Sequence, residues 1–242
     1  MLNKFNLKYH LFGDKAVLIE WPALIEERIL NDILSFKETV NNQFSNIETI
    51  SAYNSLTLIF NETINFQSIE NELKQIYKST DQSLPVKKRL WKIPVCYDPM
   101  FGIDLAVFSD EKKISIEQII KLHTSATYTV YCIGFLPGFM YLGGLNEKLY
   151  EPRRSEPRLK IPKGSVGIGG KQTGVYPKES PGGWNIIGNS PVKIFNPYAE
   201  NPCEINIGDK VKFYKISKAR HELIGVEVDA DIFNLESEVL DG

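Results

Sequence analysis

The sequence predicts an α+β N-terminal domain over residues 1–88, followed by a mostly-β barrel domain over residues 89–242. Two amphipathic helical stretches alternate with short apolar strands before residue 88, whereas apolar runs of strand length dominate after it. Twelve of the seventeen glycines and six of the thirteen prolines lie between Gly134 and Gly188, which is typical of short strands joined by sharp turns. A chain of 242 residues is long enough for two domains.

The N-terminal elements are predicted to follow the order β-α-β-β-α-β, which is that of a ferredoxin-like sandwich. Pro22 suits the first turn of a helix, and apolar residues recur every three or four positions after it. Asn65 is a favourable N-cap for the second helix. The predicted elements are a strand or hairpin at 8–21, a helix at 22–42, strands at 47–52 and 56–60, a helix from Asn65, and a strand at 88–95.

The C-terminal elements are predicted to be almost wholly β. Ser115 and Gln118 form a capping box ahead of one short helix, which carries His123 on its apolar face. Gly208-Asp209 has the composition of a hairpin turn. Many short strands with few helices indicate a closed or nearly closed barrel. The predicted strands are 128–135, 165–169, 184–187, 192–196, 204–207 and 211–216.

Composition argues against several classes of protein. The formal net charge of −2 provides no electrostatic footprint for nucleic acid. No stretch approaches the roughly 20 apolar residues of a membrane span, and the N-terminus lacks a signal-peptide core, so we expect a cytoplasmic protein. Cys96, Cys132 and Cys203 are widely spaced, which predicts reduced thiols. No His, Cys or carboxylate spacing is that of a metal site.

The run GIGGKQTG, from Gly167 to Gly174, has the glycines and lysine of a phosphate loop without its spacing. A Walker A loop needs a glycine five places before Gly170, where Ser165 stands, and a Ser or Thr directly after Lys171. The alternative is a different phosphate site, in which the backbone of Gly169 and Gly170 acts together with Lys171.

Two further groups have both a functional and a structural interpretation. His123 is either a general acid or base, since histidine titrates near neutral pH, or a core histidine bonded to its surroundings. Arg153, Arg154 and Arg158 lie in a proline-stiffened loop. They either recognise a carboxylate or phosphate through the guanidinium fork or are solvated at the surface.

The stretch from Gln172 to Trp184 has the composition of a polar pocket with aromatic walls. Amide, hydroxyl, phenol and indole groups are separated there by glycine and proline, which can hold them on a rigid loop. The alternative is a loop with a structural role only. The candidate substrate-binding residues are Gln172, Thr173, Tyr176, Ser180 and Trp184.

Four motifs follow one another in the order of one known family. They are HTSATYTVY at 123–131, GFLPGFMYLGGL at 134–145, PRLKIPKGSVGIGG at 157–170, and QTGVYPKESPGGWNIIG at 172–188. On these motifs the chain resembles the family of 5-oxoprolinase B subunits, also known as the KipI or allophanate hydrolase subunit 1 family. The resemblance covers essentially the whole chain, although the N-terminal part is less specific.

The resemblance implies a ferredoxin-like domain joined to a cyclophilin-like β-barrel. It also implies one component of a bacterial ATP-dependent 5-oxoprolinase, which opens 5-oxoproline to glutamate together with a C-type partner and a separate A-type partner. ATP would activate the lactam, a poor electrophile, by phosphorylating its carbonyl oxygen, either on this chain or with a partner. The candidate catalytic residues are His123 and Arg158, and the candidate phosphate ligands are Lys171, Gly169 and Gly170.

Two alternative functions stay open at this point. A KipI-like inhibitor would bind a sporulation histidine kinase through an exposed aromatic patch, for which Phe135–Tyr141 is the candidate. A component of an allophanate or other amide hydrolase is the third interpretation, although the chain lacks the GxSxG nucleophile motif. Because no complete catalytic group is visible, we expect the isolated chain to be nearly inactive.

Overall fold

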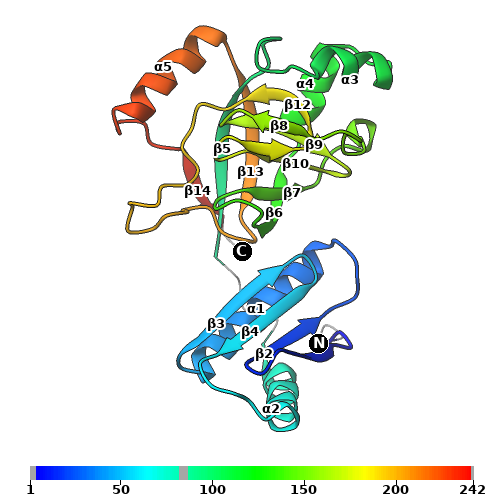
Figure 1. Ribbon diagram of the computed structural model, residues 1–242, viewed down its shortest axis with the longest axis vertical. Coiled ribbons are helices and arrows are strands. Elements are labelled where there is room, and N and C mark those ends of the chain that lie inside the picture. The colour runs from blue at the N-terminus through cyan, green and yellow to red at the C-terminus, as the bar shows by residue number, and fades with distance from the viewer. Residues whose placement is uncertain (1–3, 82–86, 241–242) are drawn as a thin grey trace. The chain divides into compact units, whose positions relative to one another are not determined.

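The computed structural model describes residues 4–81 and 87–240, which divide into two compact units at Lys87–Lys88 (Figure 1). Each unit has its own core of buried apolar side chains. Among the described residues, every helix is too short or too polar to cross a lipid bilayer.

The N-terminal unit is one antiparallel sheet packed against two helices. The sheet has the order β1-β2-β4-β3, and Val17, Ile19, Leu56 and Leu58 bury its inner face against both helices. The elements are β1 (Lys8–Phe12), β2 (Ala16–Glu20), α1 (Glu27–Gln43), β3 (Ile47–Ala52), β4 (Ser55–Phe60) and α2 (Phe66–Ser79).

The predicted order β-α-β-β-α-β is wrong at the C-terminal end of the N-terminal unit. At its start, residues 8–21 form a hairpin, which confirms one of the two forms predicted there, and β1 lies at the sheet edge beside β2. The strand predicted to complete this sheet is β5 (Lys88–Cys96), which belongs to the barrel. The first helix also begins later than predicted, at Glu27. Trp21 N–H donates to the Asn54 carbonyl, and the chain then makes a tight turn in which Leu24 N–H donates to the Pro22 carbonyl, so no helix forms there.

The barrel closes through seven strands, in the order β12-β9-β10-β7-β6-β13-β5 and back to β12. The closing contact pairs Asn189 with Cys96. β14 (Ser237–Leu240) adds to β5 outside the ring. The strands are β5, β6 (Tyr128–Ile133), β7 (Met140–Gly143), β9 (Ser165–Gly169), β10 (Gln172–Val175), β12 (Asn185–Asn189) and β13 (Lys210–Ile216).

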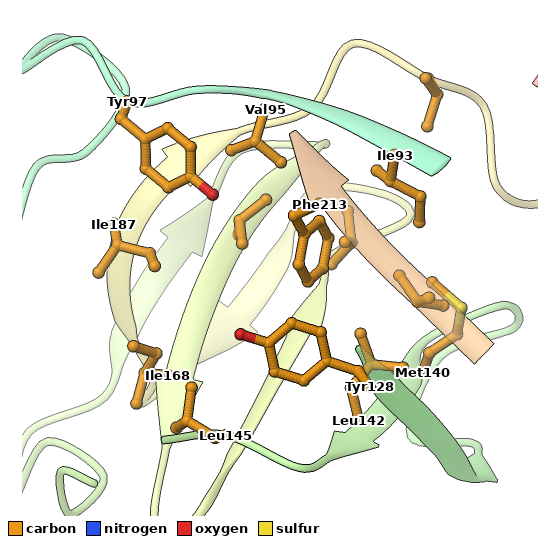
Figure 2. Packing of buried hydrophobic residues seen from close by; sticks show 14 of the residues in the cluster. Ile93, Val95, Tyr97, Tyr128, Met140, Leu142, Leu145, Ile168, Ile187 and Phe213 are labelled. Atoms are coloured by element: carbon orange, nitrogen blue, oxygen red, sulfur yellow. The ribbon is translucent and has the colours of Figure 1, made fainter. Parts of the chain in front are cut away.

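The barrel interior is filled by apolar and aromatic side chains. Tyr97, Tyr128 and Phe213 project into it beside aliphatic residues such as Ile168 and Leu142, and all five are buried (Figure 2). A packed interior of this kind leaves no channel through the barrel. The described residues thus place any ligand site outside the ring of strands or at its rim.

Smaller elements surround the barrel. The predicted helix capped by Ser115 is confirmed as α4 (Ile116–Ser125), and Ser115 accepts a hydrogen bond from Gln118 N–H at 3.2 Å. The segments 192–196 and 204–207 are not strands, although Val192 and Ile205 still enter the core. The other elements are α3 (Leu105–Lys112), η1 (Glu147–Leu149), the two-stranded sheet of β8 (Arg158–Ile161) and β11 (Ser180–Gly182), and α5 (Lys218–Asp229).

Candidate functional site

His123 is enclosed in the barrel core, near the end of α4. Its Nδ1 lies 2.7 Å from the Tyr97 hydroxyl and its Nε2 lies 3.0 Å from the Thr173 hydroxyl, which itself donates to the Gly167 carbonyl. Because a carbonyl only accepts, Thr173 must accept from Nε2–H, and Nδ1 must accept from Tyr97. Burial lowers the pKa of His123 to about 3, so the ring is neutral at physiological pH. This placement agrees with the interpretation of His123 as a core histidine.

Glycines line the outer face of β9 and β10 beneath the Trp184 indole. A Cβ atom added at Gly169 would lie 2.7 Å from the indole ring, and one at Gly174 would lie 3.2 Å from it. At Gly167 the added atom would lie 3.1 Å from Trp184 Cβ. Side chains at these positions would push the indole off the sheet, so the glycines allow a large aromatic side chain to lie close to the strands.

Trp184 is the centre of an aromatic cluster on this outer face. Phe139 contacts it edge-on at a centroid distance of 5.3 Å, and Tyr141 at 5.9 Å. Tyr176 packs on Phe139 at 5.1 Å, and burial raises the pKa of its phenol to about 12. Trp184 and Tyr176 are only 4% and 1% exposed, so most of their area is used in packing within the protein.

Arg153 covers the exposed side of the aromatic cluster. Its guanidinium carbon lies 5.8 Å from the Trp184 ring centroid and its side chain hydrogen-bonds the Tyr141 phenol. A guanidinium over an indole face is attracted by the ring quadrupole. The cluster therefore reaches the surface as a cation above aromatic rings, which is chemistry suited to an anionic or planar group.

Arg158 is held by a carboxylate that the sequence analysis did not identify. Asp104, at the start of α3, accepts from Arg158 Nη1 at 2.9 Å and Nη2 at 2.5 Å, and from Arg154 Nη1 at 3.3 Å. The same carboxylate accepts from Ile186 N–H at 2.7 Å. The Asp104 side chain is 7% exposed, whereas those of Arg154 and Arg158 are 37% and 26% exposed. Two guanidiniums against one carboxylate leave a positive charge at this surface.

The three predicted phosphate ligands do not form a cradle within this chain. Gly170 N–H donates to the Glu151 carbonyl at 2.6 Å, and Gly169 is covered by Trp184. Lys171 is exposed, with its ammonium 5.7 Å from the Tyr150 ring centroid. Lys171 is therefore the member of this set that could reach an anion.

The remaining predicted residues do not converge on one cavity. Thr173 points into the barrel, whereas its neighbour Gln172 lies on the opposite side of the same strand. Ser180 is 7% exposed and its hydroxyl donates to the Pro181 carbonyl at 3.1 Å. Within the described part of the chain, no group of three or more His, Cys, Asp or Glu side chains is placed to hold a metal ion.

Sequence reasoning missed Asp104, and it did not join Arg153 to Tyr141, which it predicted only as part of the Phe135–Tyr141 patch. Asp104 lies 54 positions from Arg158 in the chain, so nothing local links the two. Its position immediately before an apolar run is a helix N-cap signal, and that was the available indication. Arg153 was identified only as one member of a basic loop.

Residues 7–205 match the family model described as carboxyltransferase domain, subdomain C and D. A curated relative, the B subunit of 5-oxoprolinase from Bacillus subtilis, is 36% identical over 219 residues, which cover 85% of this chain and 91% of that protein.

Two solved structures share the fold. The crystal structure of TTHA0988 superposes with a TM-score of 0.73 at 29% identity over 84% of this chain, which spans 40% of that longer chain. The urea carboxylase of Kluyveromyces lactis superposes with a TM-score of 0.79 over 99% of this chain, which spans 25% of that protein. At 20% identity, the second likeness shows the fold alone.

Proposed function

Because the chain belongs to the family of 5-oxoprolinase B subunits, we propose that it is one subunit of a bacterial ATP-dependent 5-oxoprolinase. The enzyme would open 5-oxoproline to glutamate in the cytoplasm. The observation that carries the proposal is the identity to a curated B subunit over 91% of that protein's length. We also propose that the closed ring of seven strands is a cyclophilin-like barrel and that the N-terminal unit is ferredoxin-like, with an edge strand that comes from residues 8–12.

The geometry supports a subunit that works only with partners. His123 is enclosed, Arg158 is paired with Asp104, and the predicted phosphate ligands do not surround one space. Partner proteins of the C and A types would supply the missing groups. In TTHA0988, more than half of the chain lies beyond the part that this chain covers, which is consistent with a second component beside this fold.

We assign anion contacts to the surface that bears Lys171 and Arg153. Lys171 is exposed and Arg153 lies over the aromatic cluster, so both could contact the phosphates of ATP at a seam with a partner. Phosphorylation of the lactam carbonyl oxygen by ATP would create a leaving group at the carbon that water attacks. Arg158 would act by fixing Asp104 and thereby the Ile186 backbone, rather than by touching the substrate.

The test is reconstitution with the proteins encoded beside this chain. The complete mixture should hydrolyse ATP only when 5-oxoproline is added, and omission of this chain should abolish the activity. A complete mixture that assembles yet shows no 5-oxoproline-dependent ATP hydrolysis would contradict the proposal.

Inhibition of a histidine kinase is the second candidate, and Phe135 is the observation that favours it. Phe135 is 62% exposed and has a φ of +68°, so the chain presents an apolar ring in a strained backbone conformation. The rest of the predicted patch offers less surface to a kinase, since Phe139 and Met140 are buried. Kinase autophosphorylation that is unchanged by excess protein would exclude this role for the kinase assayed.

A further inference from the structure

A cavity of about 370 Å³ lies in the barrel unit, and none of the site residues predicted from sequence lines it. Its walls come from the turn before α3, the start of β9, the end of β12 and the first turn of α5. The volume falls within the range of small-molecule pockets, roughly 300–1,000 Å³. The lining includes Phe101, Ile103, Lys163, Ser165, Asn189 and His221.

The hydrogen bonds of Asn189 fix the tautomer of His221. Asn189 Nδ2 donates to the Lys163 carbonyl at 2.8 Å, which turns Oδ1 toward His221 Nε2, also at 2.8 Å. Since Oδ1 only accepts, the proton of the neutral imidazole sits on Nε2. Burial lowers the pKa of His221, against a smaller opposing effect of Glu222. Nδ1 therefore carries a lone pair, and no residue that the structure describes hydrogen-bonds it.

Ser165 supplies a second unused polar group to the cavity. The residue is 2% exposed, and within residues 4–81 and 87–240 nothing hydrogen-bonds its hydroxyl. Ser165 Oγ is not fully enclosed, so it can bond solvent in the empty cavity, and a ligand oxygen would take the place of that water. Lys163 adds an exposed ammonium at the rim, which forms no ion pair with the described residues.

Rigid backbone holds these groups in place. Gly164, with a φ of +79°, packs so closely that an added Cβ atom would lie 2.8 Å from Asn189 Oδ1. Phe101 lies 4.3 Å from the His221 ring, centroid to centroid. Phe101 itself sits on a turn that packs against the β12 backbone, because a Cβ atom at Gly102 would lie 2.6 Å from the Ile187 carbonyl oxygen. A cavity built in this way needs little ordering when a ligand binds.

We propose that this cavity binds a small amide that carries a carboxylate. His221 Nδ1 accepts the amide N–H, the Lys163 ammonium pairs with the carboxylate, and the Ser165 hydroxyl donates to a ligand oxygen. Phe101 and Ile103 contact the carbon skeleton. The choice of 5-oxoproline, a lactam acid, as the physiological ligand rests on the proposed function.

The cavity wall is also tied to the arginine pair of the candidate site. Ile186 lines the cavity, its N–H donates to Asp104, and its carbonyl accepts from Asp104 N–H at 3.0 Å. Arg158 is thus a positioning residue for this wall. A substrate here would lie next to the charged surface without contacting Arg158 directly.

The experiment measures the KM for 5-oxoproline in the complete mixture of subunits. His221→Ala and Lys163→Ala should each raise KM about tenfold, which corresponds to the loss of one hydrogen bond to a charged or buried group. The matched controls are His10→Ala and Lys160→Ala, which remove the same residue types at exposed positions outside the cavity and should leave KM within about twofold of the wild type. Thermal unfolding of each variant excludes loss of structure, and Lys163 is exposed enough to be replaced safely.

The outcomes separate this inference from the proposed function. If the mixture is active and both cavity variants keep the wild-type KM, the cavity inference is overturned and the function stands. If the wild-type mixture is inactive, binding of N-acetylglycine, an open-chain amide with a carboxylate, is followed by saturation-transfer NMR. Binding that is lost in His221→Ala then supports the cavity without the enzyme, and no binding by the wild type refutes it.

Discussion

The buried carboxylate of Asp104 should contribute several kcal/mol to the free energy of unfolding of the barrel unit. It accepts two hydrogen bonds from Arg158, one from Arg154 and one from Ile186 N–H. Asp104→Ala removes all four. The Ile186 N–H is buried and would be left unpaired at a cost of about 1–3 kcal/mol. Arg158 is 26% exposed and regains water, so its lost pairing adds about 1 kcal/mol and not the full penalty of an enclosed charge.

We therefore expect Asp104→Ala to lower the free energy of unfolding by about 2–4 kcal/mol. Asp104→Asn keeps an oxygen for Ile186 N–H and should lose only about half as much. The assay is urea unfolding, monitored through hydrogen exchange of peptides that cover β12. This readout reports on the barrel unit alone. Glu179→Ala is the control, because the Glu179 pair with Lys160 is exposed and should contribute less than about 0.5 kcal/mol. A loss below about 0.5 kcal/mol for Asp104→Ala would refute the reasoning.

Three further predictions address packing, charge and docking. Gly169→Ala should destabilise the barrel by about 1–3 kcal/mol, because the added Cβ atom would displace the Trp184 indole. Gly225→Ala should stabilise α5, because its added Cβ atom would have nothing within 4 Å. Equal losses of unfolding free energy at both sites, measured by urea unfolding, would contradict this. For His123, whose pKa falls from 6.5 to about 3 on folding, stability should decline by about 1.4 kcal/mol per pH unit as pH falls below 6.5, and His123→Ala should reduce the slope of the whole protein by that amount. Unfolding curves with an unchanged slope in the variant would exclude a buried neutral ring. Phe135→Gly should stabilise the isolated chain by about 1 kcal/mol through relief of its positive φ, yet weaken binding to a histidine kinase, the role for which Phe135 is the candidate. Asp231→Gly relieves a φ of +54° elsewhere and should leave kinase binding, measured by gel filtration, unchanged.

Local signals in the sequence explain which elements were predictable. The helices that begin after Asn65 and Ser115 were predicted because each cap is a single residue whose side chain accepts from the chain three positions later. α5 was missed because Leu223 and Val226 are exposed, which leaves no clear apolar stripe. The segment 192–196 alternates like a strand, but flanking prolines remove donors that a ladder needs.

The candidate site was less predictable than the fold because its contacts join distant parts of the chain. The glycine density correctly indicated backbone in close approach, yet what approaches at Gly167, Gly169 and Gly174 is Trp184 rather than a phosphate. Composition alone cannot distinguish a glycine under a ligand from a glycine under an indole, since both need the space of a missing Cβ. Asp104 had no pattern that linked it to the arginines.

The position of Ile186 explains how these separate features could serve one reaction. On one side its backbone is fixed by Asp104, which Arg158 holds; on the other it lines the cavity that His221 and Ser165 share. Removal of Arg158 should therefore disturb the cavity wall and alter turnover, although its guanidinium lies on Asp104. Arg158→Lys keeps the charge but cannot form the two parallel bonds to the carboxylate, so it should restore only part of the lost turnover. Full restoration by lysine would indicate that the charge at this surface, and not the placement of the wall, is what the reaction requires.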